Sequence, residues 1–296
     1  MRFTIVGAGA VGSLWAIALY KAGHHVHFTT RQPDTQVTRH FVNMPSLLFS
    51  ANNVENIQDS DCIIVCVKAF QIRDAIHAIK PYLHPDTPVV LMHNGMGSAD
   101  VALNALPDNP VLLATTSHGS LKVSTETIRH TGFGETRLGG INANGKQCDF
   151  LSDVFQHALP SCYWEEAIET ALWKKLAVNC MINPLTATLQ VQNGVLTQPE
   201  HLTQLTALSE EISEVMMAEG LVMTPKEVLN NALTVATATA ENYSSMNRDV
   251  FYLRFSEIDA ITGYLIHRAT IHGIAVPENE RLYHAIKKLE QSYDHT

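Results

Sequence analysis

The sequence predicts an α/β chain in which an N-terminal, doubly wound parallel sheet is followed by an all-helical C-terminal domain. Short apolar runs alternate with helix-like stretches in the first half, which is the pattern of successive β-α-β units. Twelve of the 16 glycines precede residue 166, and strand-like runs disappear after it. The length of 296 residues also suits two domains of about 150 residues each.

Five apolar runs are expected to be the buried strands: Phe3–Val6, His25–Thr30, Cys62–Val67, Val89–Met92 and Val111–Ala114. The run Cys62–Val67 has no polar alternation, so we expect both of its faces to be covered and its cysteines to lie in the core. Two further runs, Ser124–His130 and Glu135–Leu138, are bordered by glycines and predict a β-hairpin region that closes the sheet.

The second half of the chain has a different texture. From Ile168 onward it is rich in Ala, Leu and Met with helical periodicity, and prolines at 184, 199, 225 and 277 are expected to break it into separate helices. We expect the boundary near residues 160–166, which gives domains of residues 1–165 and 166–296.

Composition and charge exclude several classes of protein. A hydrophobic fraction of 46% with 17% charged residues is typical of a folded chain and not of a disordered one. With 20 Lys+Arg against 29 Asp+Glu, the net charge of -9 provides no basic surface for nucleic acid. The five cysteines form no C-x-x-C pair, which argues against a disulfide framework or a zinc site and favours a reducing, cytoplasmic setting. The 15 histidines are scattered, with no H-x-x-x-H arrangement, so no metal site is expected.

The uncharged segment from Phe3 to Tyr20 has the hydropathy of a signal peptide or a membrane span. Gly7, Gly9 and Gly12 interrupt it where a membrane helix usually carries larger apolar residues. A buried strand followed by a buried helix produces the same hydropathy. We therefore expect no membrane association.

The glycines in that segment form a dinucleotide-binding motif. Gly7-Ala8-Gly9-Ala10-Val11-Gly12 matches G-x-G-x-x-G between the first strand and an apolar helix, Ser13–Ala22. In this setting the first glycine permits a tight turn, the second lets the backbone approach a pyrophosphate, and the third allows the helix to pack on the strand. A simple glycine-rich turn is the alternative. The context favours a Rossmann-type cofactor domain.

The end of the second strand predicts which nicotinamide cofactor binds. An NAD site normally has Asp or Glu about 20 residues after the motif, to bind the ribose 2′-hydroxyl. Here the strand runs into Arg31, whose guanidinium can pair with a 2′-phosphate. NADP(H) is therefore preferred over NAD(H), unless Arg31 is only a solvated charge at the strand end.

One helix of the second half carries polar residues at regular spacing. Lys175, Asn179 and Asn183 stand at i, i+4 and i+8 in an otherwise apolar helix, so they share one face. Unpaired buried polar groups cost about 1–3 kcal/mol each, so these residues either form a satisfied structural network or contact a ligand. Lys174 points elsewhere and is expected to be solvated.

Two other regions could either bind a ligand or have a purely structural role. Asn94, in the segment His93–Gly97, follows a strand at the end where parallel sheets bind ligands, although an Asn-Gly pair is often only a turn. The stretches 244–249 and 256–259 of the helical half have the composition of helix caps or polar surface.

Taken together, these motifs resemble the ketopantoate reductase family over essentially the whole chain. The resemblance is carried, in order, by the following segments: Gly7–Gly12, Arg31, Lys68–Gln71, His93–Gly97, Trp173–Cys180 with Asn183–Ala187, Asn193-Gly194, Ser244–Met246 and Glu257–Asp259. It implies a Rossmann domain and a helical domain that together reduce 2-dehydropantoate to (R)-pantoate with NADPH, in pantothenate biosynthesis.

The resemblance also implies a role for individual residues. Lys175 matches the proton donor and Glu257 the active-site carboxylate. The positions that match substrate contacts are Asn94, Lys175, Asn179, Asn183, Asn193 and Ser245. The positions that match cofactor contacts are Gly7, Ala8, Gly9, Ala10, Val11, Gly12, Arg31, Lys68, Asn94, Ser120 and Glu257, among which Ser120 lies in a weakly matched segment.

Two other functions remain compatible with the sequence. One is an NADP-dependent reductase of a different 2-keto acid, because the residues that select the substrate do not reveal their positions. The other is a non-catalytic NADP-binding regulator, against which the presence of Lys175, Asn179 and Glu257 argues. The chain is expected to act as a monomer or homodimer, with cofactor and substrate meeting in a cleft between the domains.

Overall fold

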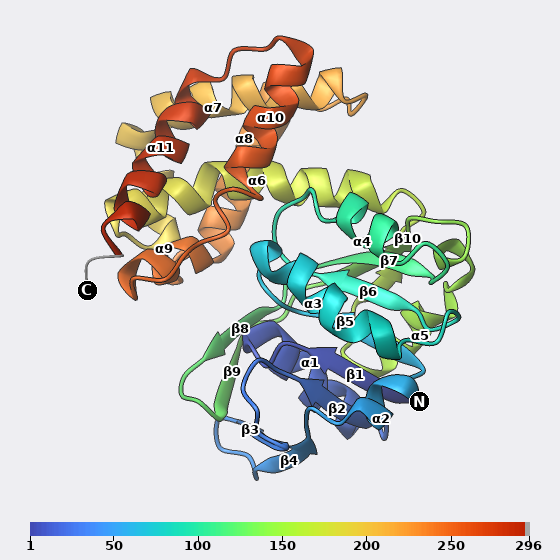
Figure 1. Ribbon diagram of the computed structural model, residues 1–296. Helices are drawn as coiled ribbons and strands as arrows, with labels where there is room; N and C mark the ends of the chain where they lie inside the picture. The colour runs from blue at the N-terminus through green and yellow to red at the C-terminus, as the bar shows by residue number, and fades with distance from the viewer. Residues whose placement is uncertain (294–296) are drawn as a thin grey trace. The chain divides into compact units, whose positions relative to one another are not determined.

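The computed structural model of the chain describes residues 1–293 and divides into two compact units (Figure 1). The first unit contains residues 1–93 and 97–171, and the second contains residues 94–96 and the chain from residue 172 onward. Residues 94–96 thus belong to the helical unit, although the residues on either side of them belong to the first unit.

The first unit is built on a seven-stranded sheet in the order β11-β10-β7-β6-β5-β1-β2. Its strands are β1 (Arg2–Val6), β2 (His25–Thr29), β5 (Cys62–Val65), β6 (Val89–Met92), β7 (Val111–Thr116), β10 (Thr136–Gly140) and β11 (Cys162–Trp164). The strands from β2 to β7 in this order are parallel, and β10 is antiparallel to β7. The five predicted strands and the predicted α/β fold class are confirmed.

The strand order reverses at β1, which lies between β2 and β5. The loop after β1 therefore lies at the topological switch point, where open α/β sheets bind their ligands.

Helices cover both faces of this sheet (Figure 1). On one face, α1 (Ala10–Lys21) and α5 (Phe150–Ala158) share a core with alternate strand residues, and the rings of Trp15 and Phe155 lie 4.9 Å apart. The other face is covered by α3 (Ile72–Ile79) and α4 (Ala99–Ala105), which bury apolar residues of their own. A short helix, α2 (Val54–Gln58), and the 3-10 turns Ala69–Gln71, Lys80–Tyr82 and Gly145–Gln147 complete the connections.

Complete burial of β5 agrees with its unbroken apolar sequence. Cys62 is fully buried, and Cys66 packs against the same core. Burial raises the pKa of the Cys66 thiol to about 12, so it stays protonated and unreactive near neutral pH.

A second, smaller sheet has the order β4-β3-β9-β8, with the strands β3 (Gln36–Phe41), β4 (Leu47–Ser50), β8 (Gly119–Lys122) and β9 (Thr127–Gly132). The predicted β-hairpin of residues 124–130 and 135–138 is therefore wrong, because β9 pairs with β8 and β3 whereas β10 pairs with β7 and β11. Glycines fix β10 in the large sheet: a Cβ at Gly139 would lie 2.2 Å from the carbonyl oxygen of Glu165. The strand β8 was not predicted because it is short and mostly polar, yet it is the antiparallel hydrogen-bonding partner of β9.

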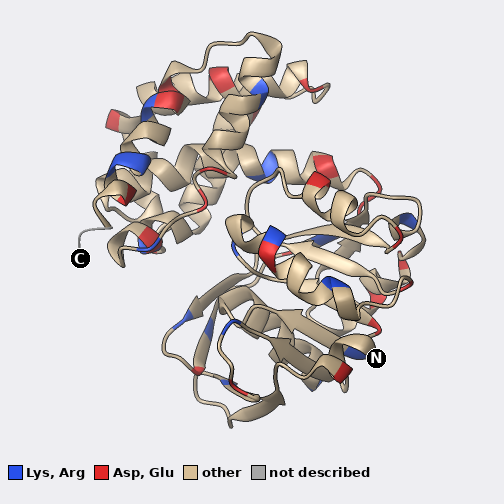
Figure 2. Cartoon of the chain, in the orientation of Figure 1, with Lys and Arg blue, Asp and Glu red and all other residues tan. Residues whose placement is uncertain are grey.

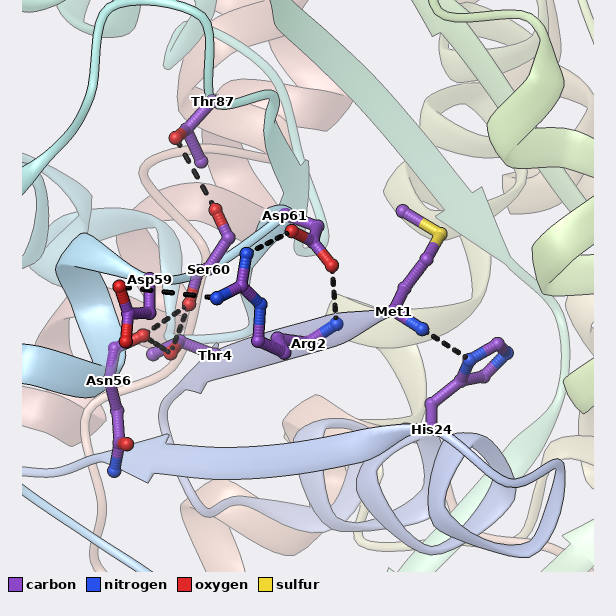
Figure 3. A network of polar contacts seen from close by, with 9 residues as sticks. All are labelled: Met1, Arg2, Thr4, His24, Asn56, Asp59, Ser60, Asp61 and Thr87. Carbon is purple, nitrogen blue, oxygen red and sulfur yellow. Dashed lines mark hydrogen bonds and ion pairs between the residues drawn. The ribbon is translucent and has the colours of Figure 1, made fainter.

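A polar network ties the N-terminal ends of β1 and β5 together (Figure 3). The Arg2 guanidinium pairs with the Asp61 carboxylate over 2.7 Å, and the Arg2 backbone N–H donates to the same carboxylate over 2.8 Å. Behind this pair, the hydroxyls of Thr4 and Ser60 lie 2.7 Å apart. This network fixes the strand ends opposite to the loop after β1, and the carboxyl ends stay available for ligands.

The second unit is helical. It consists of α6 (Ile168–Leu189, with its first turn in the first unit), the 3-10 turn η4 (Asn193–Thr197), α7 (Pro199–Ala218), α8 (Pro225–Ala238), α9 (Ser245–Phe251), α10 (Thr262–His272) and α11 (Pro277–Gln291). Three of the four predicted helix-breaking prolines stand at the first position of a helix, where the missing N–H costs nothing.

Pro184 does not break a helix, contrary to the prediction, because α6 continues through it. The ring removes one backbone hydrogen bond, but Ile182 and Leu185 on either side are buried in the core of this unit. Tertiary packing of that apolar surface holds the helix across the proline.

Acidic and basic residues alternate along the ribbon of both units, with no long stretch of a single sign (Figure 2). Within residues 1–293, every helix is too short or too polar to span a bilayer.

Candidate active site

The loop after β1 has the geometry that close approach of a phosphate requires. Gly7 has a φ of +103°, and a Cβ at Gly12 would lie 2.1 Å from the carbonyl oxygen of Gly7. Helix α1 begins at Ala10, with no acidic residue in its first turn and no side chain capping its N-terminus. The first backbone N–H groups of this 12-residue helix can therefore meet an anion. These features fit the diphosphate of a dinucleotide cofactor.

Arg31 stands just beyond β2 in a turn that is organised by Asn52. The side-chain oxygen of Asn52 accepts from the backbone N–H of Thr30 over 2.8 Å, and its amide donates to the carbonyls of Gln32 and Asp34. The Arg31 side chain is exposed and makes no hydrogen bond or ion pair within residues 1–293. It can therefore meet a phosphate without first leaving a protein partner.

Two further predicted cofactor residues come from neighbouring segments of the first unit. Lys68 follows β5 and begins the turn Ala69–Gln71, where its backbone N–H donates to the side chain of Gln71 over 3.3 Å. The Ser120 hydroxyl, from β8, donates to the carbonyl of Ala10 over 2.9 Å. Ser120 therefore braces the glycine loop directly.

In the second unit, Asn94, Lys175 and Glu257 come together. The side-chain amide of Asn94 donates to the Glu257 carboxylate over 3.1 Å. Lys175 lies on α6, and the negative charge of Glu257 acts on its ammonium. Burial lowers the pKa of Lys175 to about 8, and the attraction to Glu257 partly offsets this effect. The result is a lysine whose proton is much easier to transfer near neutral pH than that of a solvated lysine.

The segment that carries Asn94 is held against the loop before α10. The backbone N–H of Met96 donates to the carbonyl of Ala260 over 2.8 Å. Gly95 has a φ of +82°, and a Cβ there would lie 2.4 Å from the carbonyl oxygen of Ala260. Only glycine allows this contact, which fixes Asn94 beside Glu257.

The three predicted asparagines of the helical half occupy different environments. Asn179 is partly buried and Asn183 is buried. They follow Lys175 by four and eight residues on α6, so they share one helix face with the lysine. Asn193, in η4, is buried and donates from its side chain to the Thr239 hydroxyl over 2.9 Å. Its side-chain oxygen has no hydrogen-bond partner within residues 1–293, so it can still accept a bond from a ligand.

The two adjacent serines at the start of α9 have separate roles. Ser244 is buried, accepts from the backbone N–H of Asn247 over 3.0 Å, and accepts from the Thr186 hydroxyl over 2.8 Å. Ser245 is exposed. Ser244 therefore caps the helix, whereas the side chain of Ser245 is accessible to solvent. Lys174 is exposed, as predicted.

Sequence reasoning missed two residues that shape the cofactor loop region, Asn52 and Arg39. Arg39 is 6% exposed and lies on β3, where its guanidinium contacts the glycine loop. The sequence pattern could have identified Arg39, because it occupies the inward-facing position between Val37 and Phe41 in a short alternating strand. Among residues 1–293, no three His, Cys, Asp or Glu side chains gather in a way that could hold a metal ion.

Two family models match this chain. The model described as ketopantoate reductase PanE/ApbA matches residues 3–143, and the model of the C-terminal part of the same family matches residues 167–290. A curated relative, the 2-dehydropantoate 2-reductase of Vibrio cholerae, is 44% identical over 293 residues, which cover 99% of both chains.

Solved structures show the same fold over the whole chain. A PanE/ApbA family ketopantoate reductase from Ralstonia eutropha has a TM-score of 0.87 at 28% identity, covering 100% of both chains. A dimeric ketopantoate reductase from Staphylococcus aureus has a TM-score of 0.81 at 26% identity, covering 99% of this chain and 100% of that one.

A D-mandelate dehydrogenase with NADH and anilino(oxo)acetate reaches a TM-score of 0.90, covering 99% of this chain and 100% of that one, but at 21% identity this likeness concerns the fold alone. Function is better indicated by the matched family models and by the relative at 44% identity. The chain belongs to the ketopantoate reductase PanE/ApbA family.

Proposed function

We propose that this chain reduces 2-dehydropantoate to (R)-pantoate with NADPH, and that Lys175 protonates the product oxygen. The observation that carries this proposal is the set formed by Asn94, Lys175 and Glu257, in which a lysine with a pKa of about 8 lies in the field of a carboxylate. The family name supplies the substrate class, and these residues supply the acid that a ketone reduction needs.

The preference for NADPH rests on Arg31. No acidic residue stands at the end of β2 to bind a ribose 2′-hydroxyl, and the exposed guanidinium of Arg31 is suited to a 2′-phosphate. Lys68 adds a second positive charge from the end of β5. The residues Gly7–Gly12 would hold the diphosphate, with Ser120 bracing them through Ala10.

The residues Gly7–Gly12, Arg31 and Lys68 would hold NADPH, which when bound would supply the hydride for the C2 ketone carbon of the substrate. As the carbonyl oxygen becomes negative, the Lys175 ammonium stabilises it and then transfers a proton to it. Glu257 keeps Lys175 charged until that point, since its carboxylate raises the pKa that burial lowers. Asn94 holds the Glu257 carboxylate through a hydrogen bond and so fixes the charge beside the lysine.

The remaining polar residues are assigned to substrate binding. Asn179, Asn183, Asn193 and Ser245 would bind the carboxylate and the hydroxyl of the substrate without adding a charge that competes with Lys175. Asn193 supports this assignment with a buried side-chain oxygen that has no partner within residues 1–293.

We assign residues 1–165 to cofactor binding and residues 166–296 to substrate binding and catalysis. The substrate is a small molecule, and neither nucleic acid nor a membrane is proposed as a partner. We place the reaction in the cytoplasm, which suits five cysteines that are all free thiols in the structure. The chain acts as a monomer or as a homodimer, the latter by analogy with the dimeric relative.

The proposal is tested by measuring NADPH and NADH oxidation with 2-dehydropantoate and with a panel of other 2-keto acids. We expect the highest kcat/KM with 2-dehydropantoate and NADPH. A higher kcat/KM with another keto acid would identify a different reductase, and tight cofactor binding without turnover on any keto acid would identify a binding protein.

A further inference from the structure

Arg39 is a buried cation that lies against the glycine loop. Its Nε donates to the Ser13 hydroxyl over 2.9 Å, and one terminal nitrogen donates to the carbonyl of Ala8 over 3.1 Å. The other terminal nitrogen donates to the carbonyl of Thr38 over 2.7 Å. Ala8 is the second residue of G-x-G-x-x-G, and Ser13 follows its last glycine. The Arg39 side chain therefore hydrogen-bonds near the start and just after the end of the motif.

All three hydrogen-bond partners of this guanidinium are neutral. Within residues 1–293 no carboxylate lies within 4.0 Å of Arg39, whereas Arg2, Arg137, Arg268 and Arg281 each pair with an acidic side chain. Burial lowers the pKa of Arg39, and the charge of exposed Glu126 only partly offsets this. Buried charges in proteins are usually paired. The counter-charge of Arg39 is therefore expected from an anion that binds at the loop.

The hydrogen bond to Ala8 also orients the neighbouring peptide group. In a trans peptide the C=O of one residue and the N–H of the next point in opposite directions. Because Arg39 holds the Ala8 carbonyl, the Gly9 N–H points away from β3, and it makes no hydrogen bond within residues 1–293. This donor stands immediately before the N-terminus of α1, where a diphosphate would bind.

We propose that Arg39 is a positioning residue for the cofactor diphosphate. It fixes the Ala8–Gly9 peptide and places beside the glycine loop a positive charge that forms no ion pair within residues 1–293. The proposal rests on the proposed binding of a nicotinamide dinucleotide. It assigns Arg39 a role distinct from that of Arg31, since the diphosphate is common to NADPH and NADH whereas the 2′-phosphate is not.

The test measures dissociation constants for NADPH and NADH by calorimetry, so that it does not depend on turnover. Arg39→Met removes the charge and the hydrogen bonds while keeping an apolar stem of similar length. Arg39→Lys keeps the charge but cannot make the forked contacts to Ala8 and Ser13. Arg129→Met is the matched control, because Arg129 is an exposed arginine on β9, the strand that pairs with β3.

We expect Arg39→Met to weaken NADPH and NADH binding about tenfold or more, with the ratio between the two cofactors unchanged. Arg39→Lys should weaken NADPH and NADH binding less than Arg39→Met does, and by the same factor for both cofactors. Arg129→Met should bind both cofactors as the parent protein does. The salt dependence of cofactor binding should also be shallower in Arg39→Met, since one attracting charge is gone. A purely structural role would leave that dependence unchanged.

Parent-like binding of both cofactors by Arg39→Met would overturn the proposal, as would a loss confined to NADPH. If Arg39→Met does not fold, the decision passes to Arg39→Lys, whose parent-like affinity would equally overturn it. A parent protein that binds neither cofactor would instead refute the proposed function.

Discussion

Asn94 donates a hydrogen bond to Glu257 over 3.1 Å, although 163 positions separate the two residues in the sequence. Asn94 follows the last residues of a sheet strand, and Glu257 lies in the loop between α9 and α10. The contact joins a residue predicted to bind both ligands to the carboxylate whose charge acts on Lys175.

Gly95→Ala should separate Asn94 from Glu257. The added Cβ would lie 2.4 Å from the carbonyl oxygen of Ala260, so the segment has to move. We expect a loss of about 1–3 kcal/mol in the free energy of unfolding and at least a tenfold lower turnover. Gly220→Ala is the matched control, because Gly220 has the same φ of +82° but nothing within 4 Å of the added Cβ. Chemical denaturation and steady-state assays of both variants check this, and equal turnover in the two would contradict it.

Lys175→Met should abolish most of the activity and leave the fold intact. Loss of a positioned general acid typically costs about 10²–10⁴-fold in rate. Because burial disfavours the ammonium, the thermal unfolding midpoint at pH 7 should not fall below that of the parent protein. NADPH affinity, measured separately, should be retained. Turnover within threefold of the parent value would remove Lys175 from the mechanism.

Arg31→Ala should weaken NADPH binding far more than NADH binding. The Arg31 side chain is exposed and has no protein partner within residues 1–293, so its removal costs little stability. We expect the preference for NADPH over NADH to fall about tenfold or more, since a charge-assisted contact to phosphate is lost. The ratio of the two dissociation constants is the measurement, and equal weakening of both cofactors would contradict the assignment.

Ser244→Ala should impair stability, whereas Ser245→Ala should impair substrate binding. Ser244 caps α9 and accepts from Thr186, so its replacement should lower the free energy of unfolding by about 1–2 kcal/mol. Ser245 is exposed, so its replacement should leave stability unchanged and raise KM for the keto acid. Denaturation curves and substrate titrations of both variants test the pair. A stability loss in Ser245→Ala alone would reverse the two assignments.

The large sheet was predictable because its strands carry continuous apolar runs between turn residues. β5, for example, begins at Cys62 as predicted and ends at Val65, two residues earlier than its apolar run. The helical half was predictable from its composition. Pro184 misled the prediction because local backbone rules favour a break there, whereas burial of Ile182 and Leu185 holds the helix together.

The small sheet was not predictable because its strands are short and polar, and their partners are distant in sequence. β8 has the sequence Gly-Ser-Leu-Lys and pairs with β9. The strand expected to pair with β9 was β10, which lies in the large sheet beside β7.

The candidate site shows the same division between local and distant information. Lys175, Asn179 and Asn183 stood out by helical spacing alone, because a helix places every fourth residue on one face. The contact between Asn94 and Glu257 has no local signal, since it depends on how separate segments meet. Arg39 was visible only as an arginine at an inward strand position, and its approach to Ala8 depends on pairing within the small sheet.

The most direct test of the proposed roles of Lys175 and Glu257 is the pH dependence of kcat in the parent protein and in Glu257→Gln. Lys175 has to be protonated to act as an acid, so kcat should be constant at low pH and fall as the pH rises through about 8. Glu257→Gln removes the charge that raises the pKa of Lys175, so the fall should move to lower pH. A kcat that stays constant between about pH 7 and 10, or a midpoint unmoved by Glu257→Gln, would contradict the proposal that Lys175 is the proton donor and that Glu257 sets its charge.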